Sequence, residues 1–456
     1  MTTTERTQIP APTEPRPFHF PSFERFHLNN GLQILFARDK HFPLVNVTLC
    51  VHSSALMDAP GKEGVAHLTS ELLTEGTANR TSVQIANELE FMGVHYGSHS
   101  DWNALYLEMN TLARYLEPAF DVFSDMALHP SFPEEELERV RKELMVERLR
   151  VADNPSRLAS EKFSNLLYGM FRYGRPIEGT YESLQKITRQ DVAAFYEHHV
   201  LPGNSTLIVV GDVTRKKVEN LAEAFFGSWP PAEISTMGEM EFKQPLKTRV
   251  AVVHKPDSAQ AELRMGHLGI ARNNPDYYAV TVMNEILGGY FLSRINMNLR
   301  EEHGYTYGAH SIFSYRKGLG PFFITAAIHS ENVADAVQEV LKEVRYLRSE
   351  KVEREELENA KGQLIGVFPI AFETADQIAM GLANIVISRL PDDYYHKFRE
   401  RIAAVTAEDV LRVAQKYLLP DKMLIVVTGD REQLIAQLRP LFDVTVFDQN
   451  GNLLTE

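Results

Sequence analysis

The sequence predicts an α+β fold of two tandem homologous α/β domains, each an antiparallel-rich sheet with helices packed on one face. Two observations predict this class. The chain has 456 residues, more than one ordinary domain needs, and a long segment of its first half recurs in its second half. Strand-like segments also occur in groups instead of alternating regularly with helices, which favours an antiparallel-rich sheet.

The repeat keeps a strict register. The segment from Ile187 to Asp212, ITRQDVAAFYEHHVLPGNSTLIVVGD, recurs from Val405 to Asp430 as VTAEDVLRVAQKYLLPDKMLIVVTGD. The same offset relates three pairs, Asp191 with Asp409, Pro202 with Pro420, and Gly211 with Gly429. We therefore expect two copies of one domain, at residues 23–229 and 248–456.

The remaining two segments are expected to lie outside the domains. Residues 1–22 contain five prolines between Pro10 and Pro21, which rules out a helix and indicates an extended arm. Residues 230–247 mix proline, glycine and charged residues without an apolar period, which is typical of a linker.

The elements of the first copy follow from its hydrophobic periodicity. A strand is expected where apolar residues alternate with Asn46 and Thr48, namely at Val45, Val47, Leu49 and Val51. Helical periods follow at Gly64 to Thr74, Ser82 to Met92, Leu112 to Leu128, Glu134 to Ala152 and Arg189 to His198. Further strands are expected at Leu105 to Met109 and Thr206 to Val210.

Composition excludes several classes of function. The chain is 44% hydrophobic and 24% charged, as in ordinary globular proteins, and its net charge of −14 argues against nucleic acid as the main partner. The single cysteine, Cys50, allows no internal disulfide.

The sequence has neither a signal-like segment at its amino terminus nor a run of about 18 apolar residues. We expect no membrane span and a cytoplasmic protein, or a periplasmic one if a signal segment was removed.

The segment GVAHLTSELLTEGT, from Gly64 to Thr77, resembles the zinc helix of the pitrilysin and mitochondrial processing peptidase family, the inverzincins. In that family the helix reads H-x-x-E-H and a Gly-Thr turn follows. Other marks of the family are DNP at Asp153 to Pro155, YGRPIEGT, VVGDV at Val209 to Val213, and LGGYFLSRINMNLREEHGYTYG at Leu287 to Gly308. The resemblance spans nearly the whole chain and implies half of a clamshell chamber that binds peptides.

The zinc motif itself is degenerate. The resemblance sets His67 on the first zinc histidine, Ser70 on the general base glutamate and Glu71 on the second zinc histidine. A working site needs two histidines on one helix face and a glutamate that deprotonates the zinc-bound water. A serine hydroxyl is too short and too weak a base for that role.

Two interpretations of the remaining ligands stay open. Glu147 lies where the family keeps its third zinc ligand, so His67, Glu71 and Glu147 could form a poor metal site. The alternative, which we favour because zinc prefers imidazole, is that His67 and Glu71 form a polar i,i+4 pair. We therefore expect no cofactor in this chain, and zinc in a partner subunit.

The carboxyl-terminal half keeps family residues that act on the substrate, although the zinc motif of the amino-terminal half is degenerate. Arg300 and Tyr307, in LREEHGYTYG, match the family's arginine and tyrosine pair, which contacts the substrate carbonyl as negative charge develops on it. We expect Gly304 to end the helix that carries Arg300, so that Tyr307 enters the next strand. The alternative is a solvated arginine beside an ordinary sheet-face tyrosine.

The resemblance therefore implies the non-catalytic subunit of a heterodimeric zinc metallopeptidase. A homologous catalytic partner would carry an intact H-x-x-E-H, and this chain would add Arg300, Tyr307 and a chamber wall that binds the peptide substrate. A catalytically inactive scaffold or peptide-binding homologue is the alternative. A self-sufficient peptidase with altered ligands fails on Ser70, unless a water or another carboxylate takes over as base.

Other polar groups have simpler interpretations. His95, His99 and Asp101 have a spacing that could ligate a metal, but a solvated sheet face is favoured. Favourable interactions with helix dipoles account for the rest, namely His198 and His199 in a last turn and the acidic run Glu134 to Glu138 in a first turn.

Overall fold

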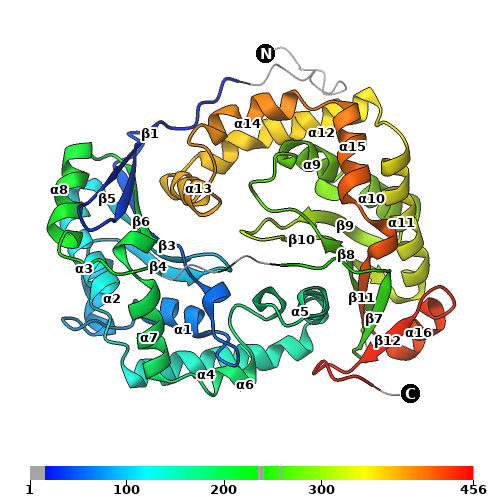
Figure 1. Ribbon diagram of the computed structural model, residues 1–456, viewed down its shortest axis with the longest axis horizontal. Helices are drawn as coiled ribbons and strands as arrows, with labels where there is room; N and C mark the ends of the chain where they lie inside the picture. The colour runs from blue at the N-terminus through cyan, green and yellow to red at the C-terminus, as the bar shows by residue number, and fades with distance from the viewer. Residues whose placement is uncertain (1–15, 235–237, 239–240, 257, 455–456) are drawn as a thin grey trace, which may run out of the picture.

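The computed structural model describes residues 16–234, 238, 241–256 and 258–454. It contains two six-stranded sheets, one from each half of the chain (Figure 1). The half drawn in blue to green lies on the left of that view, and the half drawn in green to red lies on the right. The predicted α+β class with two tandem domains is confirmed.

Five strands follow the same order in the two sheets, whereas the outermost strand differs. The first runs β1 (Phe23–His27), β2 (Gln33–Arg38), β6 (Ser205–Gly211), β3 (Leu44–Val51), β5 (Leu105–Leu112) and β4 (His95–Ser100). The second runs β12 (Val444–Phe447), β7 (Arg249–His254), β11 (Leu424–Gly429), β8 (Gln260–Leu268), β10 (Pro321–His329) and β9 (Thr306–Phe313). In both sheets the second and third strands in this order are parallel, and the pairs from the third strand to the last are antiparallel. Strand β1 is the first strand of its domain and antiparallel to its neighbour, whereas β12 is the last strand of its domain and parallel to its neighbour. The internal repeat thus extends to the topology of the other five strands.

The helices agree with the predicted periods to within a few residues. Those of the first half are α1 (Val65–Leu72), α2 (Ser82–Phe91), α3 (Leu116–Leu128), α4 (Glu134–Arg150), α5 (Pro155–Tyr168), α6 (Tyr181–Leu184), α7 (Arg189–His199) and α8 (Arg215–Phe226). Those of the second half are α9 (Tyr277–Asn284), α10 (Arg294–Asn296), α11 (Val333–Ser349), α12 (Arg354–Val367), α13 (Ala375–Ile387), α14 (Tyr394–Ala403), α15 (Ala407–Tyr417) and α16 (Arg431–Leu438).

The repeated segment begins with the same local device in both domains. Thr188 and Asp191 form a capping box at the start of α7, with Asp191 Oδ2 2.7 Å from the Thr188 amide. Thr406 and Asp409 form the same capping box at the start of α15. Each box satisfies amide groups that the first turn of a helix leaves free, which explains why these residues recur in register.

The domains exchange one helix each. Helix α5 packs on β8 and β11 of the second sheet, where Phe163 and Leu167 join a core with Val253 and Val426. Helix α13 packs on β3 and β6 of the first sheet. Both sheets are therefore covered on both faces, whereas the sequence predicted helices on one face.

Strand β3 shows why the sequence suggested an open second face. Asn46 and Thr48 interrupt its apolar residues, yet both are fully buried. The Thr48 hydroxyl donates to Asn46 Oδ1 at 2.9 Å, and the Asn46 amide donates to Asn110 Oδ1 at 3.2 Å. Because these polar groups bond one another, they tolerate burial on a face that helix α13 covers.

Only the end of the predicted arm lies in the described part of the chain. Phe20 is buried, and its ring lies 5.0 Å from the ring of Phe372 and 4.9 Å from that of Tyr395. These contacts fix the end of the arm on helices of the second domain (Figure 1).

Among the described residues, no single helix has the length and apolar character needed to cross a membrane. The segments Arg354–Phe372 and Ala375–Ile387 reach that threshold only as a pair, which bends by 110°.

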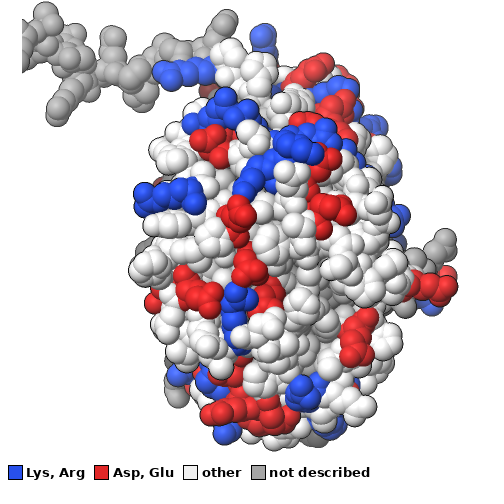
Figure 2. Space-filling model, turned by 90° about the vertical axis from the view of Figure 1, so that its left-hand side faces the viewer, with Lys and Arg blue, Asp and Glu red and all other residues white. Residues whose placement is uncertain are grey.

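The face formed by the first domain carries mixed charge. Figure 2 shows acidic and basic side chains interspersed over it, and several are paired. Arg215 of α8 contacts Glu24 at 3.0 Å, and Lys217 contacts Glu117. On this face, basic side chains form no broad surface of the kind that a nucleic-acid backbone requires.

Candidate active site

The degenerate zinc helix α1 is positioned by a buried ion pair that precedes it. Asp58 accepts hydrogen bonds from the Gly64 amide at 2.7 Å and the Ala66 amide at 3.0 Å. Its carboxylate also contacts Arg172 Nη2 at 2.7 Å, and both side chains are buried. Burial raises the pKa of Asp58 even though Arg172 and the two amides oppose that shift. Sequence reasoning missed this pair, since Asp58 and Arg172 lie outside the motif they support.

Gly64 can be only a glycine in this geometry. Its φ is +100°, and a Cβ atom there would lie 2.6 Å from the carbonyl oxygen of Glu178. The left-handed conformation and the close approach together allow α1 to begin directly against the segment 178–179.

The residues of the degenerate motif bond locally. His67 Nδ1 lies 3.1 Å from the Ser100 hydroxyl on β4, and His67 Nε2 lies 4.0 Å from Glu71 Oε1. Ser70 is fully buried, and its hydroxyl donates to the His67 carbonyl at 2.8 Å. The Ser70 hydroxyl is therefore engaged inside its own helix, where it cannot replace a general base.

The structure does not support the alternative metal set of His67, Glu71 and Glu147. Glu147, on α4, pairs with Arg157 Nη1 at 2.9 Å. The residues that the structure describes contain no group of three or more His, Cys, Asp or Glu side chains that could hold a metal ion. His67 and Glu71 are brought together, but Glu147 does not complete a site with them, so the donor set does not fit zinc.

The histidines of β4 also have other contacts. The ring of His99 stacks on Tyr106 at 4.6 Å. Asp101 accepts hydrogen bonds from the amides of Asn103 and Ala104, and His95 is exposed at the other end of the strand. The three residues do not converge, because Asp101 shapes the turn between β4 and β5.

The two histidines and the acidic run lie at helix ends, as the sequence predicted. His198 Nδ1 lies 2.6 Å from the Ala194 carbonyl, and the His199 ring packs against Phe195 at 4.5 Å. Burial, followed by the neighbouring His198, lowers the pKa of His199. Three of the acidic residues, Glu134 to Glu136, occupy the first turn of α4.

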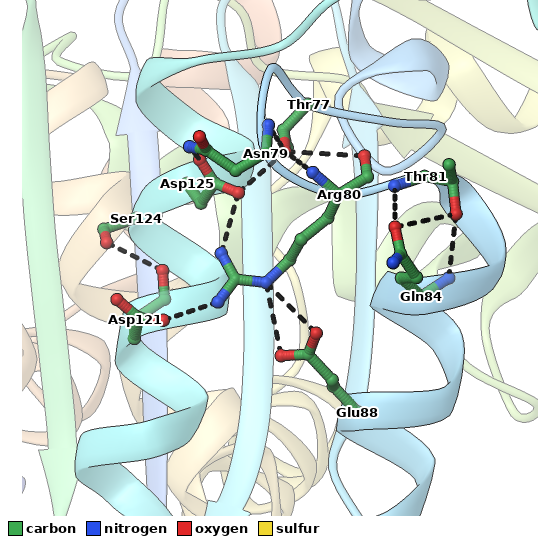
Figure 3. Close-up of polar contacts among 9 residues, drawn as sticks. All are labelled: Thr77, Asn79, Arg80, Thr81, Gln84, Glu88, Asp121, Ser124 and Asp125. Atoms are coloured by element: carbon green, nitrogen blue, oxygen red, sulfur yellow. Dashed lines mark hydrogen bonds and ion pairs between the residues drawn. The ribbon is translucent and has the colours of Figure 1, made fainter.

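A cluster of charges fixes the Gly-Thr turn that follows α1 (Figure 3). Asp125 of α3 accepts hydrogen bonds from the Thr77 hydroxyl at 2.7 Å, from Asn79 at 2.6 Å and from Arg80 at 2.8 Å. Arg80 also contacts Asp121 and Glu88. Burial alone would raise the pKa of Asp125, but the three donors outweigh it and hold that pKa below its usual value. The turn is thereby tied to α2 and α3.

The arginine and tyrosine pair lies in the second domain. Arg300 is in the irregular helical segment Met297–Glu302, Gly304 has a φ of +67°, and Tyr307 is the second residue of β9, as predicted. The helical segment packs against β9. The turn at Gly304 thus joins the segment that carries Arg300 to the edge strand that carries Tyr307.

Both polar groups of this pair are available to a ligand. Tyr307 is 81% exposed, and within the described part of the chain its hydroxyl has no hydrogen-bond partner. The Arg300 guanidinium lies over the Phe291 ring at 4.6 Å, and its one ion pair among the described residues is with its neighbour Glu301, at 3.1 Å. Strand β9 is an edge strand, paired with β10 alone. An edge of this kind can accept an extended peptide beside the two side chains.

The two candidate regions lie in different domains. Helix α1 belongs to the left half of Figure 1, and β9 belongs to the right half. The degenerate motif and the Arg300 and Tyr307 pair are thus carried by separate halves of the chain.

Comparisons with known proteins identify the family. A model described as insulinase (peptidase family M16) matches residues 33–181, and one described as peptidase M16 inactive domain matches residues 186–364. The chain is 27% identical over 402 residues to an uncharacterized zinc protease of Rickettsia bellii, covering 87% of this chain and 95% of that protein. It is 22% identical over 431 residues to a probable mitochondrial-processing peptidase subunit beta of Schizosaccharomyces pombe, covering 91% and 93%.

A solved structure agrees with this assignment. The peptidase M16 inactive domain from Pseudomonas fluorescens superposes with a TM-score of 0.82 at 27% identity, covering 90% of this chain and 98% of that one. Since the two family models together span most of both domains, the chain belongs to peptidase family M16.

Proposed function

We propose that this chain is the non-catalytic subunit of a two-chain zinc metallopeptidase. In this proposal a homologous partner with an intact H-x-x-E-H holds the zinc and the general base. This chain supplies Arg300, Tyr307 and the edge of β9, which hold an extended peptide across the shared site. The relative from Schizosaccharomyces pombe is itself described as a subunit, which supports a multi-chain assembly.

One observation carries the proposal. The Ser70 hydroxyl is bonded inside the zinc helix, at the position of the general base, while Tyr307, on an edge strand that packs against the segment of Arg300, has a hydroxyl without a hydrogen-bond partner among the described residues. A guanidinium and a phenol aimed at a substrate carbonyl would stabilise the negative charge that develops on its oxygen. A pure scaffold has no need of that pair.

The test uses the reconstituted two-chain complex. We expect Arg300→Ala and Tyr307→Phe to lower its turnover number by roughly 100- to 1000-fold, since a lost oxyanion donor has that cost. Tyr346→Phe and Arg345→Ala, which alter exposed residues of α11, serve as matched controls and should leave turnover unchanged. Gel filtration and zinc analysis check that assembly and metal content are intact.

The scaffold alternative gives the opposite result. If both variants turn over peptide at the wild-type rate within an intact complex, this chain contributes architecture alone. If no homologous H-x-x-E-H chain associates with it at all, the two-chain enzyme is refuted.

A further inference from the structure

A cavity of about 510 Å³ lies between the two domains, away from the Arg300 and Tyr307 edge. The first domain contributes the segment after β3, with His52 and Ser54, and the second contributes Arg272, the β9 to β10 turn and the end of α13. This volume is in the range of small-molecule sites, and interfaces between domains are common places for them.

The walls of this cavity are strongly cationic. Four basic side chains line it, namely Arg272, Arg316, Lys317 and Arg389, and none of the described residues that line it is an aspartate or a glutamate. That composition is unexpected in a chain with a net charge of −14.

These cations are held in place without being neutralised. The Arg316 guanidinium lies among the rings of Trp102, Tyr168 and Tyr173, at 4.8, 5.2 and 4.4 Å from their centroids. The Arg272 guanidinium lies 4.0 Å from the centre of the Tyr277 ring. Ring contacts fix the plane of a guanidinium but leave its charge and its N–H groups free for an anion.

Asp101 affects two of these cations electrostatically, but its side chain accepts hydrogen bonds from backbone amides. The two cations are Arg316 and Lys317, and Asp101 Oδ1 accepts the amides of Asn103 and Ala104 at 2.6 and 2.8 Å. Lys317 Nζ donates instead to the His52 carbonyl at 2.8 Å. Within the described part of the chain, none of the four cations has a carboxylate at ion-pair distance.

Two buried polar atoms at the cavity lack partners in the protein. Arg316 Nη1 and the hydroxyl of the fully buried Ser54 are inaccessible to solvent and make no hydrogen bond within the described part of the chain. Buried donors are almost always satisfied, so a small side-chain movement that opens these groups to the cavity would let them donate to a ligand oxygen. Arg389 adds a backbone signature, because its φ of +52° is rare outside glycine and such conformations concentrate at ligand sites.

Histidine does not add to the charge of this cavity near neutral pH. Burial, followed by the neighbouring Lys317 and Arg389, lowers the pKa of His52 to about 4. The three arginines of the site carry permanent charges, whereas burial lowers the pKa of Lys317.

We propose that this cavity binds a small molecule that carries two or more phosphate or carboxylate groups. Arg316 and Ser54 hold one anionic group at the base of the site, and Lys317 and Arg389 hold the other near its rim. The site is independent of the proposed peptidase role, because none of its residues belongs to the degenerate motif or to the Arg300 and Tyr307 edge.

Isothermal titration calorimetry on the purified full chain tests this, with pyrophosphate and citrate as probes of the two group types. We expect saturable binding of at least one probe with a Kd below about 1 mM, weakening as salt is raised. Arg389→Gly, which suits the left-handed backbone, and Lys317→Gln should each weaken binding about tenfold. Arg345→Gln and Lys351→Gln remove exposed cations elsewhere and serve as matched controls.

Three outcomes would overturn the proposal. Neither probe binds at concentrations up to about 10 mM. Both probes bind, but Arg389→Gly and Lys317→Gln have no more effect than the two controls, which indicates general attraction to the surface. Both small probes fail, but a short polyglutamate peptide binds and Arg389→Gly and Lys317→Gln weaken its binding, which assigns the cavity to an acidic peptide.

Discussion

Replacing Asp58 by alanine tests how the zinc helix is positioned. The change removes the acceptor of the Gly64 and Ala66 amides and leaves Arg172 buried without its partner. A buried ion pair broken on one side costs about 3 to 5 kcal/mol, and the loss of a helix cap adds about 1 kcal/mol. We therefore expect Asp58→Ala to lower the free energy of unfolding of the first domain by about 4 to 6 kcal/mol.

The assay is thermal unfolding followed by circular dichroism. For a unit of about 200 residues each kcal/mol shifts Tm by about 2 to 4 °C, so the transition should fall by roughly 8 to 24 °C. Arg172→Met should cost less, because a buried carboxyl can take up a proton whereas a guanidinium cannot lose one. The double variant Asp58→Ala with Arg172→Met should recover part of the loss. A Tm shift under about 2 °C for Asp58→Ala would refute this account of how the helix is positioned.

Three further predictions follow from the same region. Gly64→Ala should destabilise the first domain by about 1 to 3 kcal/mol through backbone strain alone, and the clash of the new Cβ atom with the Glu178 carbonyl should add to that cost. Urea unfolding would measure the loss. A neutral result would show that the segment 178–179 can move. Because the pKa of Asp125 is lower in the folded state than in the unfolded state, its contribution to stability is complete above the unfolded value and is lost as pH falls through the folded one. Asp125→Asn should therefore flatten the dependence of Tm on pH at the acid end, and an unchanged profile would contradict the assignment. Finally, the purified chain alone should hydrolyse no peptide, and activity that persists through purification and disappears with a chelator would show a zinc site of its own.

Much of the fold could be predicted because the same local sequence signals occur in both domains. The register of Asp191 with Asp409 is kept by matching capping boxes, and the hydrophobic periods gave helix bounds to within a few residues. The exchange of α5 and α13 could not be predicted in this way. Periodicity identifies which side of a strand is polar, but hydrogen bonding between Asn46, Thr48 and Asn110 makes that side fit for burial.

The candidate site residues likewise divide into those that local sequence signals place and those that only folding brings together. Gly304 and the order of Arg300 and Tyr307 are local features, so the turn that joins them was expected. Asp58 and Arg172 are 114 positions apart in the sequence and belong to no motif. The four cations of the cavity come from three separate segments of the second domain, and these segments meet only in the folded structure.

The exchange of α5 and α13 has a consequence for how the chain reaches its native state. Each sheet must wait for a helix encoded in the other half, so neither half can complete its core during synthesis before the other exists. Expressed alone, the amino-terminal half would expose the face of β3 and β6 that α13 covers, together with the apolar side of α5, and should aggregate. Once both halves are present, the exchanged helices hold them together. A chain cut between residues 230 and 247 should therefore remain a single complex.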